Sequence, residues 1–462
     1  MTACNSSPDR PPLSHLGGRH ALGRATARVT ILLLAAIPML AGPAGASPPA
    51  GPDVPVEGQK SNPSGQTPSA ATAIPGSSFP AAFSPGWYDS IHYGFQVEGG
   101  LTLNPRQSGN SLQIGQLTTD RANMPLLNQF QFTLERVIDP AQTDYDVGFS
   151  FQALYGSDAR YLHYPGQFAQ IIDGRNQLVI RTANVSAHLP WLTDGGLDFK
   201  VGEYASPVGY EPYDPALSPF YSHSYIFNWG VPGYHTGALA TLHLNSTLDV
   251  WGGVDTGYNT GLGYGFGDNN RSGAGIVGLG LNGLLDGKLT VLAITHFGSE
   301  TPRLLSSTAD RDTRYYNDLV LSYKASDDLS FVSELNYVLD TFNNAEAYGI
   351  ASYASLVLTP DITLNLRGEI WRDDKGFFVA GFPRGLDPIR ALIGQSNAAF
   401  GVGPATYSEI TAGITYKVKA DASTTIAIRP ELRYDHVAGT RVFNGGRDRD
   451  AFTLATDLIL SF

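Results

Sequence analysis

From residue 91 to the C-terminus, the chain repeats segments in which apolar and polar residues alternate one by one. In the segment 91–103, Phe95 and Val97 share one parity, while Gln96 and Glu98 share the other. Because successive side chains of a strand point to opposite faces, this period of two predicts β-strands. We predict about sixteen strands, at 91–103, 126–137, 144–156, 178–189, 197–204, 234–244, 248–257, 274–282, 289–298, 315–324, 329–339, 348–357, 362–371, 407–418, 425–435 and 451–462. The weakest are 178–189, where Arg181 has the apolar parity, and 348–357.

The connections between these segments alternate in length. Those after even-numbered segments are short, such as IDPAQT (138–143) and NST (245–247). Those after odd-numbered segments are long and reach about thirty residues at 205–233 and 373–406. Short turns at one end and long loops at the other are typical of outer-membrane barrels, whereas a soluble sandwich has no reason to sort its loops by parity. We therefore predict an all-β fold, a transmembrane antiparallel up-and-down β-barrel of about 16 strands.

The segment TTIAIRPELRYD (424–435) predicts which face meets lipid. Its apolar residues alternate with two arginines and two acids, Arg429, Glu431, Arg433 and Asp435. An arginine on the lipid face near the bilayer midplane costs about 2–4 kcal/mol, so the charged residues should face a wet interior. Pro430 lacks the N–H that a central strand needs, which predicts a local bulge.

Aromatic residues near the ends of the predicted strands fit the girdles that barrels place at both membrane interfaces. The chain also ends in Phe462 after an alternating strand, as outer-membrane barrels commonly do. The predicted girdle residues are Tyr145, Tyr155, Trp191, Tyr323, Tyr337, Trp371, Tyr416 and Tyr434.

The N-terminal part of the chain looks like an export signal followed by a spacer. Arg19, Arg24 and Arg28 precede an apolar run at 29–41, and the small residues AGA follow at 44–46. We predict a signal peptide at 1–46, because the run is too short to span a bilayer comfortably. Residues 47–85 are rich in Pro, Ser, Gly and Ala, which predicts a disordered linker. The barrel domain is then 86–462.

Composition excludes several other classes of function. A net charge of −12 argues against a nucleic-acid partner, which would require a basic patch. Cys4, the single cysteine, precedes the predicted cleavage point, so neither a disulfide nor a thiolate metal site is expected. Neither a phosphate-binding loop nor a dinucleotide fingerprint occurs in a suitable context. We predict no catalytic residue, no metal ligand and no cofactor.

Five longer runs resemble the OmpL-like outer-membrane β-barrel porin family, and the resemblance covers nearly all of 85–462. It implies a pore for small solutes across a bacterial outer membrane and carries over no catalytic residue. The runs are LLNQFQFTLERVID, VGFSFQALYGSDARY, VGEYASPVGYEPYDPALSPFYSHSYIFNWGVPGYHTGALAT, LRGEIWRDDKG and IRPELRYD.

Polar residues with the interior parity are the candidate lining of the pore. A sixteen-stranded barrel is wide enough for an aqueous channel, and charged rings at a constriction set selectivity. Whether these charges pair with one another or select solutes stays open. The candidates are Gln129, Gln131, Glu135, Arg367, Glu369, Arg429, Glu431, Arg433 and Asp435.

The loop 205–233 is the third long connection, and third loops of porins commonly fold into the lumen. We expect it to narrow the pore with its acids facing the arginines, and a loop outside the barrel would contradict this. Its aromatic residues could stack on sugars or pack against the wall. The candidate constriction residues are Tyr210, Glu211, Tyr213, Asp214, Tyr221, Tyr225 and Trp229.

The function favoured by these features is a passive diffusion channel for small hydrophilic solutes or ions in the bacterial outer membrane, reached by export through the periplasm. The expected partners are outer-membrane lipid and the solutes. A homotrimer stays open, because a trimer contact is an apolar outer face like any lipid-facing surface. The alternatives are a closed-lumen barrel that serves as a surface adhesin or structural protein and, less favoured, a barrel enzyme, since scattered histidines such as His235, His243 and His296 can meet by chance.

Overall fold

The computed structural model describes residues 87–107, 111–138, 145–168, 174–261, 268–395 and 399–462. The chain divides into two compact units, 1–62 and 63–462, and only the second contains described residues. The predicted signal peptide and linker lie outside them. Among the described residues, no helix is both long enough and apolar enough to cross a membrane.

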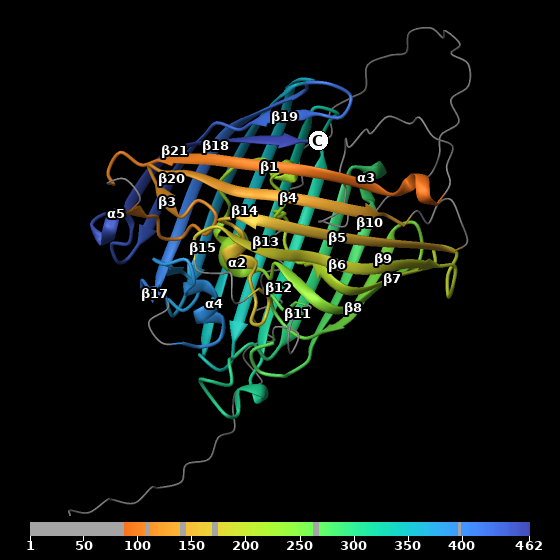
Figure 1. Ribbon diagram of the computed structural model, residues 1–462, viewed down its shortest axis with the longest axis horizontal. Helices are drawn as coiled ribbons and strands as arrows, with labels where there is room; N and C mark the ends of the chain where they lie inside the picture. The colour runs from red at the N-terminus through yellow and green to blue at the C-terminus, as the bar shows by residue number, and fades with distance from the viewer. Residues whose placement is uncertain (1–86, 108–110, 139–144, 169–173, 262–267, 396–398) are drawn as a thin grey trace, which may run out of the picture. The chain divides into compact units, whose positions relative to one another are not determined.

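Sixteen antiparallel strands form a closed barrel (Figure 1), so the predicted fold class is confirmed. The ring closes where β21 pairs with β1, from Gln96 opposite Ser461 to Leu103 opposite Leu454. The fifteenth strand is divided into two pieces, β19 and β20. In chain order the barrel strands are β1 (His92–Leu103), β4 (Pro125–Arg136), β5 (Asp146–Gly156), β6 (Gln177–Leu189), β7 (Leu197–Ala205), β8 (Tyr234–His243), β9 (Leu248–Asp255), β10 (Ala274–Gly283), β11 (Leu289–Gly298), β12 (Arg314–Lys324), β13 (Leu329–Asp340), β14 (Ala345–Thr359), β15 (Ile362–Asp373), β18 (Ala405–Lys419), β19 (Thr425–Ile428), β20 (Glu431–Ala438) and β21 (Asp450–Ser461).

Connections alternate between a short-turn end and a long-loop end of the barrel, as predicted. The long connections carry short strands and most of the small helices. These elements are β2 (Ser111–Leu112), β3 (Arg121–Ala122), α2 (Ala159–Leu162), η3 (Pro215–Leu217), η4 (Ile226–Gly230), η6 (Ala309–Arg311), β16 (Ala380–Gly381), α4 (Asp387–Leu392), β17 (Phe400–Gly401) and α5 (Phe443–Gly446). Two further helices lie elsewhere: η2 (Tyr88–Ser90) precedes β1, and α3 (Leu284–Gly287) lies in the short turn between β10 and β11.

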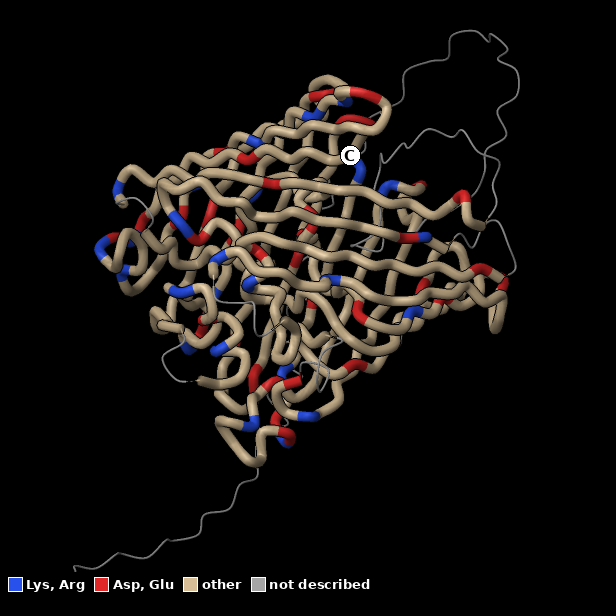
Figure 2. Tube along the Cα trace, in the orientation of Figure 1, with Lys and Arg blue, Asp and Glu red and all other residues tan. Residues whose placement is uncertain are grey.

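Each strand presents one apolar face outward and buries the other. In β21, Phe452 and Leu454 are exposed, while Thr453 and Asp457 are buried. Figure 2 shows that the middle parts of the front strands carry few charged residues. One predicted girdle residue is wrong: Trp371 is fully buried. It shares the inward parity of β15, whereas its neighbour Ile370 faces outward.

A bulge in β6 explains the misplaced parity of Arg181. Gln152 of β5 pairs with Thr182 and the next residue, Ala153, pairs with Ile180, so Arg181 is an extra residue. An extra residue reverses the inside–outside parity of the strand. Arg181 is therefore buried in the interior, where its Nε donates to Gln152 Oε1 at 2.9 Å.

The bulge predicted at Pro430 is absent. Ile428 and Glu431 are three residues apart, and so are their partners on both neighbouring strands, so no residue is inserted. The missing donor lies on the β18 side, where the Pro430 carbonyl still accepts from Ile414 N at 3.0 Å. The strand therefore loses one hydrogen bond and keeps its register.

Candidate functional site

One side of the barrel interior is lined by charged side chains, called here the charged wall. Its members project from neighbouring strands, β15, β18, β19–β20, β21 and β1. None exposes more than 6 % of its surface. They are Arg367, Glu369, Glu409, Arg429, Glu431, Arg433, Asp435, Asp457 and Glu98.

Ion pairs run along this wall. Arg367 Nε donates to Glu409 Oε1 at 2.6 Å, and Arg433 Nη2 donates to Asp435 Oδ1 at 2.7 Å. Arg429 bonds Asp457 and also reaches Glu98 Oε1 at 3.1 Å. Burial of a charge is costly unless it is paired and hydrogen-bonded, and each arginine satisfies both conditions.

The third long connection, residues 206–233, is bound along the charged wall and is called here the inner loop. The wall arginines donate to its backbone carbonyls. These bonds are Arg367 Nη1 to Ser222 O (2.9 Å), Arg433 Nη1 to His223 O (2.7 Å), and Arg429 Nη1 to Pro215 O (2.8 Å) and Ser218 O (2.7 Å).

Wall glutamates bind the backbone amides of the same loop. Glu431 Oε2 accepts from Tyr221 N at 2.9 Å, and its two oxygens share the N–H of Ser222. Glu369 accepts from Tyr225 N at 2.6 Å and from Ile226 N at 2.8 Å. The wall therefore matches the donors and acceptors of the loop main chain, with arginines on carbonyls and carboxylates on amides.

The acids of the inner loop have different partners. Glu211 Oε1 lies 2.9 Å from Arg367 Nη1, and its Oε2 lies 2.6 Å from His223 Nδ1. Burial alone would raise the pKa of Glu211, but Arg367 and His223 outweigh it and hold that pKa at about 2. Asp214 instead accepts from Gln96 Nε2 at 2.9 Å. Of the two acids, Glu211 contacts an arginine of the wall.

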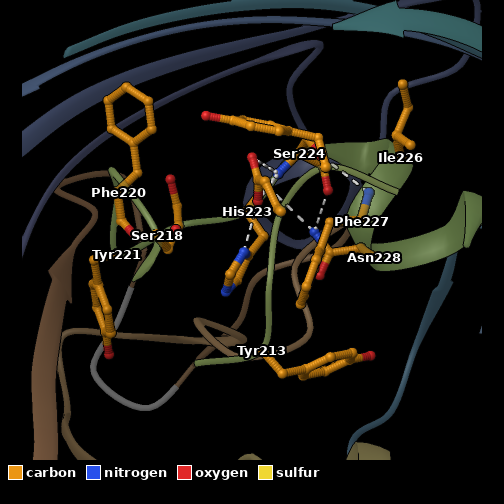
Figure 3. Close-up of polar contacts among 12 residues, drawn as sticks. Tyr213, Ser218, Phe220, Tyr221, His223, Ser224, Ile226, Phe227 and Asn228 are labelled. Atoms are coloured by element: carbon orange, nitrogen blue, oxygen red, sulfur yellow. Dashed lines mark hydrogen bonds and ion pairs between the residues drawn. The ribbon is translucent and has the colours of Figure 1, made fainter. Parts of the chain in front are cut away.

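Aromatic residues of the inner loop pack against the barrel and against one another, and Figure 3 draws Tyr213, Phe220, Tyr221 and Phe227 of this loop. Tyr225 stacks on Tyr407, with 4.8 Å between ring centroids, and its hydroxyl donates to Asp435. Tyr210 packs on Tyr353 at 4.7 Å, and Tyr213 packs on Phe227 of the same loop at 4.6 Å. The Tyr221 hydroxyl donates to Asn128 at 2.9 Å and the Trp229 indole to Gly115 O at 3.1 Å. These rings are used in packing the loop.

The opposite side of the interior carries many more apolar side chains, interspersed with buried acids such as Asp318 and Glu334, and alternation alone did not predict this. Leu239, Trp251, Ile276, Leu292, Ile294, Val320 and Val332 line it from β8 to β13. Val208, Ile226 and Val231 of the inner loop belong to the same buried cluster. The loop therefore has a polar edge on the charged wall and a mainly apolar edge on this second wall, where Glu334 Oε1 also accepts from Tyr210 N at 3.0 Å.

The first long connection also enters the interior, a feature that sequence reasoning missed. Leu117 N donates to Asn228 Oδ1 of the inner loop at 3.3 Å, and Gly115 O accepts from Trp229. Gly115 has φ of +90°, and a Cβ there would lie 2.8 Å from the Tyr225 ring. Only glycine fits this contact without displacement.

The remaining candidates project from β4. Gln129 and Gln131 are buried, and Gln129 Nε2 donates to Tyr213 O at 3.0 Å and to Asp158 Oδ2 at 3.1 Å. Glu135 is only half-buried and lies near the short-turn end of its strand. Gln129 thus binds the inner loop, as the charged wall does, whereas Glu135 takes no part in that contact.

Among solved structures, porins share this fold. OmpF of Salmonella typhi in complex with daunomycin has a TM-score of 0.50 at 11 % identity, covering 81 % of this chain and 99 % of its own. The channel DcaP of Acinetobacter baumannii has a TM-score of 0.48 at 12 % identity, covering 80 % and 97 %. OprB of Pseudomonas putida has a TM-score of 0.47 at 12 % identity, covering 81 % and 95 %.

No curated protein sequence matches the chain. At the level of sequence families, the description "Putative beta-barrel porin-2, OmpL-like" matches residues 90–462, which include every barrel strand. The chain therefore belongs to the OmpL-like family of β-barrel porins.

Proposed function

We propose that the protein is a passive diffusion channel of the bacterial outer membrane for small hydrophilic solutes or ions, with its lumen narrowed by the inner loop. The observation that carries the proposal is the binding of this loop to inward-facing charged side chains. Loop carbonyls and amides are held by Arg367, Arg429, Arg433, Glu369 and Glu431. The apolar outer face supports a membrane location, since lipid-facing positions of such barrels are apolar.

The balance of charge on the wall supports a preference for cations. Acidic side chains of the wall outnumber its basic ones by six to three: Glu98, Glu369, Glu409, Glu431, Asp435 and Asp457 against Arg367, Arg429 and Arg433. Rings of acidic side chains favour cations in channels.

Conductance of the purified and refolded chain in a planar lipid bilayer tests the proposal. We expect discrete current steps and, under a salt gradient, a reversal potential of the sign set by cation flow. An anion-type reversal potential would overturn the charge preference alone. The absence of current from a protein shown to be folded would overturn the proposal that it is a channel.

A closed-lumen barrel, acting as an adhesin or structural protein, is the second candidate. It is favoured by one observation: the inner loop is bound along its polar edge and packed along its apolar edge. A barrel that is silent with the loop intact and conducts after the loop is shortened would support this candidate.

A further inference from the structure

Three buried side chains that the channel proposal does not use meet near the long-loop end of the barrel. His235 lies near the start of β8, Asp255 ends β9, and His296 lies near the end of β11. Between β9 and β11 runs β10, whose residue opposite Asp255 is the small Ala274. The strand register thus brings together residues that are far apart in sequence.

The potential ligand atoms of this cluster are close. His296 Nε2 lies 3.1 Å from Asp255 Oδ1, and His235 Nδ1 lies 3.6 Å from Asp255 Oδ2. One ligand atom from each residue can be chosen so that all lie within 4.8 Å of one another. All three side chains are fully buried. The cluster is compact enough for a single ion to contact all three residues.

Several polar atoms of the cluster have no hydrogen-bond partner. They are His235 Nδ1, Asp255 Oδ2 and His296 Nδ1, and the buried Tyr204 hydroxyl beside His235 is unpaired as well. Unpaired buried polar groups are rare, and each calls for an explanation such as a bound ion. His235 Nδ1 and Asp255 Oδ2 face each other across 3.6 Å without a hydrogen bond.

We propose that His235, Asp255 and His296 bind one divalent transition-metal ion, with Zn²⁺ as the best match. Two imidazoles and one carboxylate are a donor set that such ions accept, and a water or a neighbouring hydroxyl can complete the shell. The other ring nitrogen of His235, Nε2, lies 3.0 Å from Ser206 Oγ. Partners of this kind fix the orientation of metal-binding imidazoles.

The site lies at the base of the inner loop. Ser206 begins the loop, His235 follows its end, and Ser206 N donates to Gly233 O at 3.0 Å. A metal bound by His235 would therefore tie the base of the loop to β9 and β11. This links metal occupancy to the position of the loop, although binding itself is independent of whether the barrel conducts.

Zinc content of the refolded full-length chain tests the site. The protein is incubated with Zn²⁺, separated from free metal by gel filtration and analysed by elemental mass spectrometry. We expect roughly one ion per chain, and near-background metal in His235→Ala and His296→Ala. His243→Ala is the matched control, because His243 lies on the same strand at the opposite end of the barrel and contacts Asp249 and Asp198 instead. It should retain the full amount.

The proposal is overturned if the unaltered chain holds no more zinc than His296→Ala, or if His243→Ala loses it equally. Folding of every variant is checked by its migration on a gel before and after heating. Should the alanine variants fail to fold, the unaltered chain gives the answer through bound Co²⁺. Intense visible absorption bands would support a site with nitrogen ligands and few waters, and the weak spectrum of hydrated Co²⁺ would contradict it.

Discussion

At the scale of single residues, Arg367 links the barrel to the inner loop. Its guanidinium donates to Glu409 and Thr411 on the barrel and to Glu211 and Ser222 on the loop. Removal of one partner from a buried ionic network leaves the others uncompensated. Arg367 is therefore the residue at which the charged wall can be tested most directly.

We expect Arg367→Met to lower the free energy of unfolding by about 3–5 kcal/mol, because Glu211 and Glu409 lose their cation. Arg372→Met is the control, since Arg372 lies on the same strand with a partly exposed ion pair to Asp374. It should change stability by less than about 1 kcal/mol. Urea titration of barrels folded in lipid vesicles measures both. Equal effects would contradict the importance of the buried network.

The depressed pKa of Glu211 predicts an acid dependence of stability. The folded-state pKa is about 2, below the value of about 4.3 expected in an unfolded chain. The stabilisation is thus present above pH ~4.3 and lost as the pH falls toward 2. We expect the Glu211→Gln variant to lose less stability than the unaltered protein as the pH falls through this interval. Urea midpoints measured from pH 5 to pH 2 should converge for the two proteins, and parallel curves would contradict the assignment.

At the scale of elements, the outward face of each strand should tolerate apolar residues only. Ile410, in β18, is 66 % exposed on that face. We expect Ile410→Arg to destabilise the barrel in lipid by about 2–4 kcal/mol, whereas Ile410→Leu should be nearly neutral. Equilibrium folding into vesicles measures the difference. If Ile410→Arg leaves the folding free energy in lipid unchanged, this face of the strand does not contact lipid.

The inner loop is the element expected to set the conductance. Replacement of residues 212–229 by a short Gly-Ser linker should raise the single-channel conductance several-fold, since the bound chain leaves the lumen. The matched control is a similar shortening of 303–311, part of another long connection that includes η6 and the exposed Leu304 and Leu305. That change should leave the conductance unaltered. If neither shortened variant changes the conductance, the inner loop does not narrow the pore.

Strand positions and inward charges could be predicted because both follow from the period of two. The errors arise where that period is broken or where it says nothing. At Arg181 an inserted residue reverses the inside–outside parity of β6. At Pro430 the strand lacks one backbone hydrogen bond but keeps its register without a bulge. Trp371 follows the parity of β15 and faces inward, whereas the girdle prediction rests on its residue type alone. His235 and His296 lie on different strands, so only the register brings them together.

At the scale of the whole molecule, the interior has a charged side and a mainly apolar side, and the inner loop contacts both. Glu369 and Glu431 each accept from loop amides through both carboxylate oxygens, and glutamine supplies only one such oxygen. The double variant Glu369→Gln and Glu431→Gln therefore keeps one acceptor for the loop at each position and removes two acidic groups from the wall.

We expect this double variant to shift the reversal potential toward anions by a severalfold fall in the cation-to-anion permeability ratio. Asp327→Asn, at an exposed short turn, is the control and should leave the potential unchanged. Bilayer recordings under one salt gradient compare the three proteins. An unaltered potential in the double variant would assign selectivity to other groups.

The pairing of β1 with β21 also bears on how the barrel forms. Phe462 N donates to Phe95 O at 2.9 Å, and Phe95 N donates to Phe462 O, so the closing ladder includes the last residue. These contacts have the greatest sequence separation in the fold, and the entropy of loop closure must be overcome before they form. Hairpins between neighbouring strands can assemble one after another, but the ring is complete only when both terminal strands are present. A chain without either terminal strand would therefore leave its neighbours with unpaired edges in place of a closed ring.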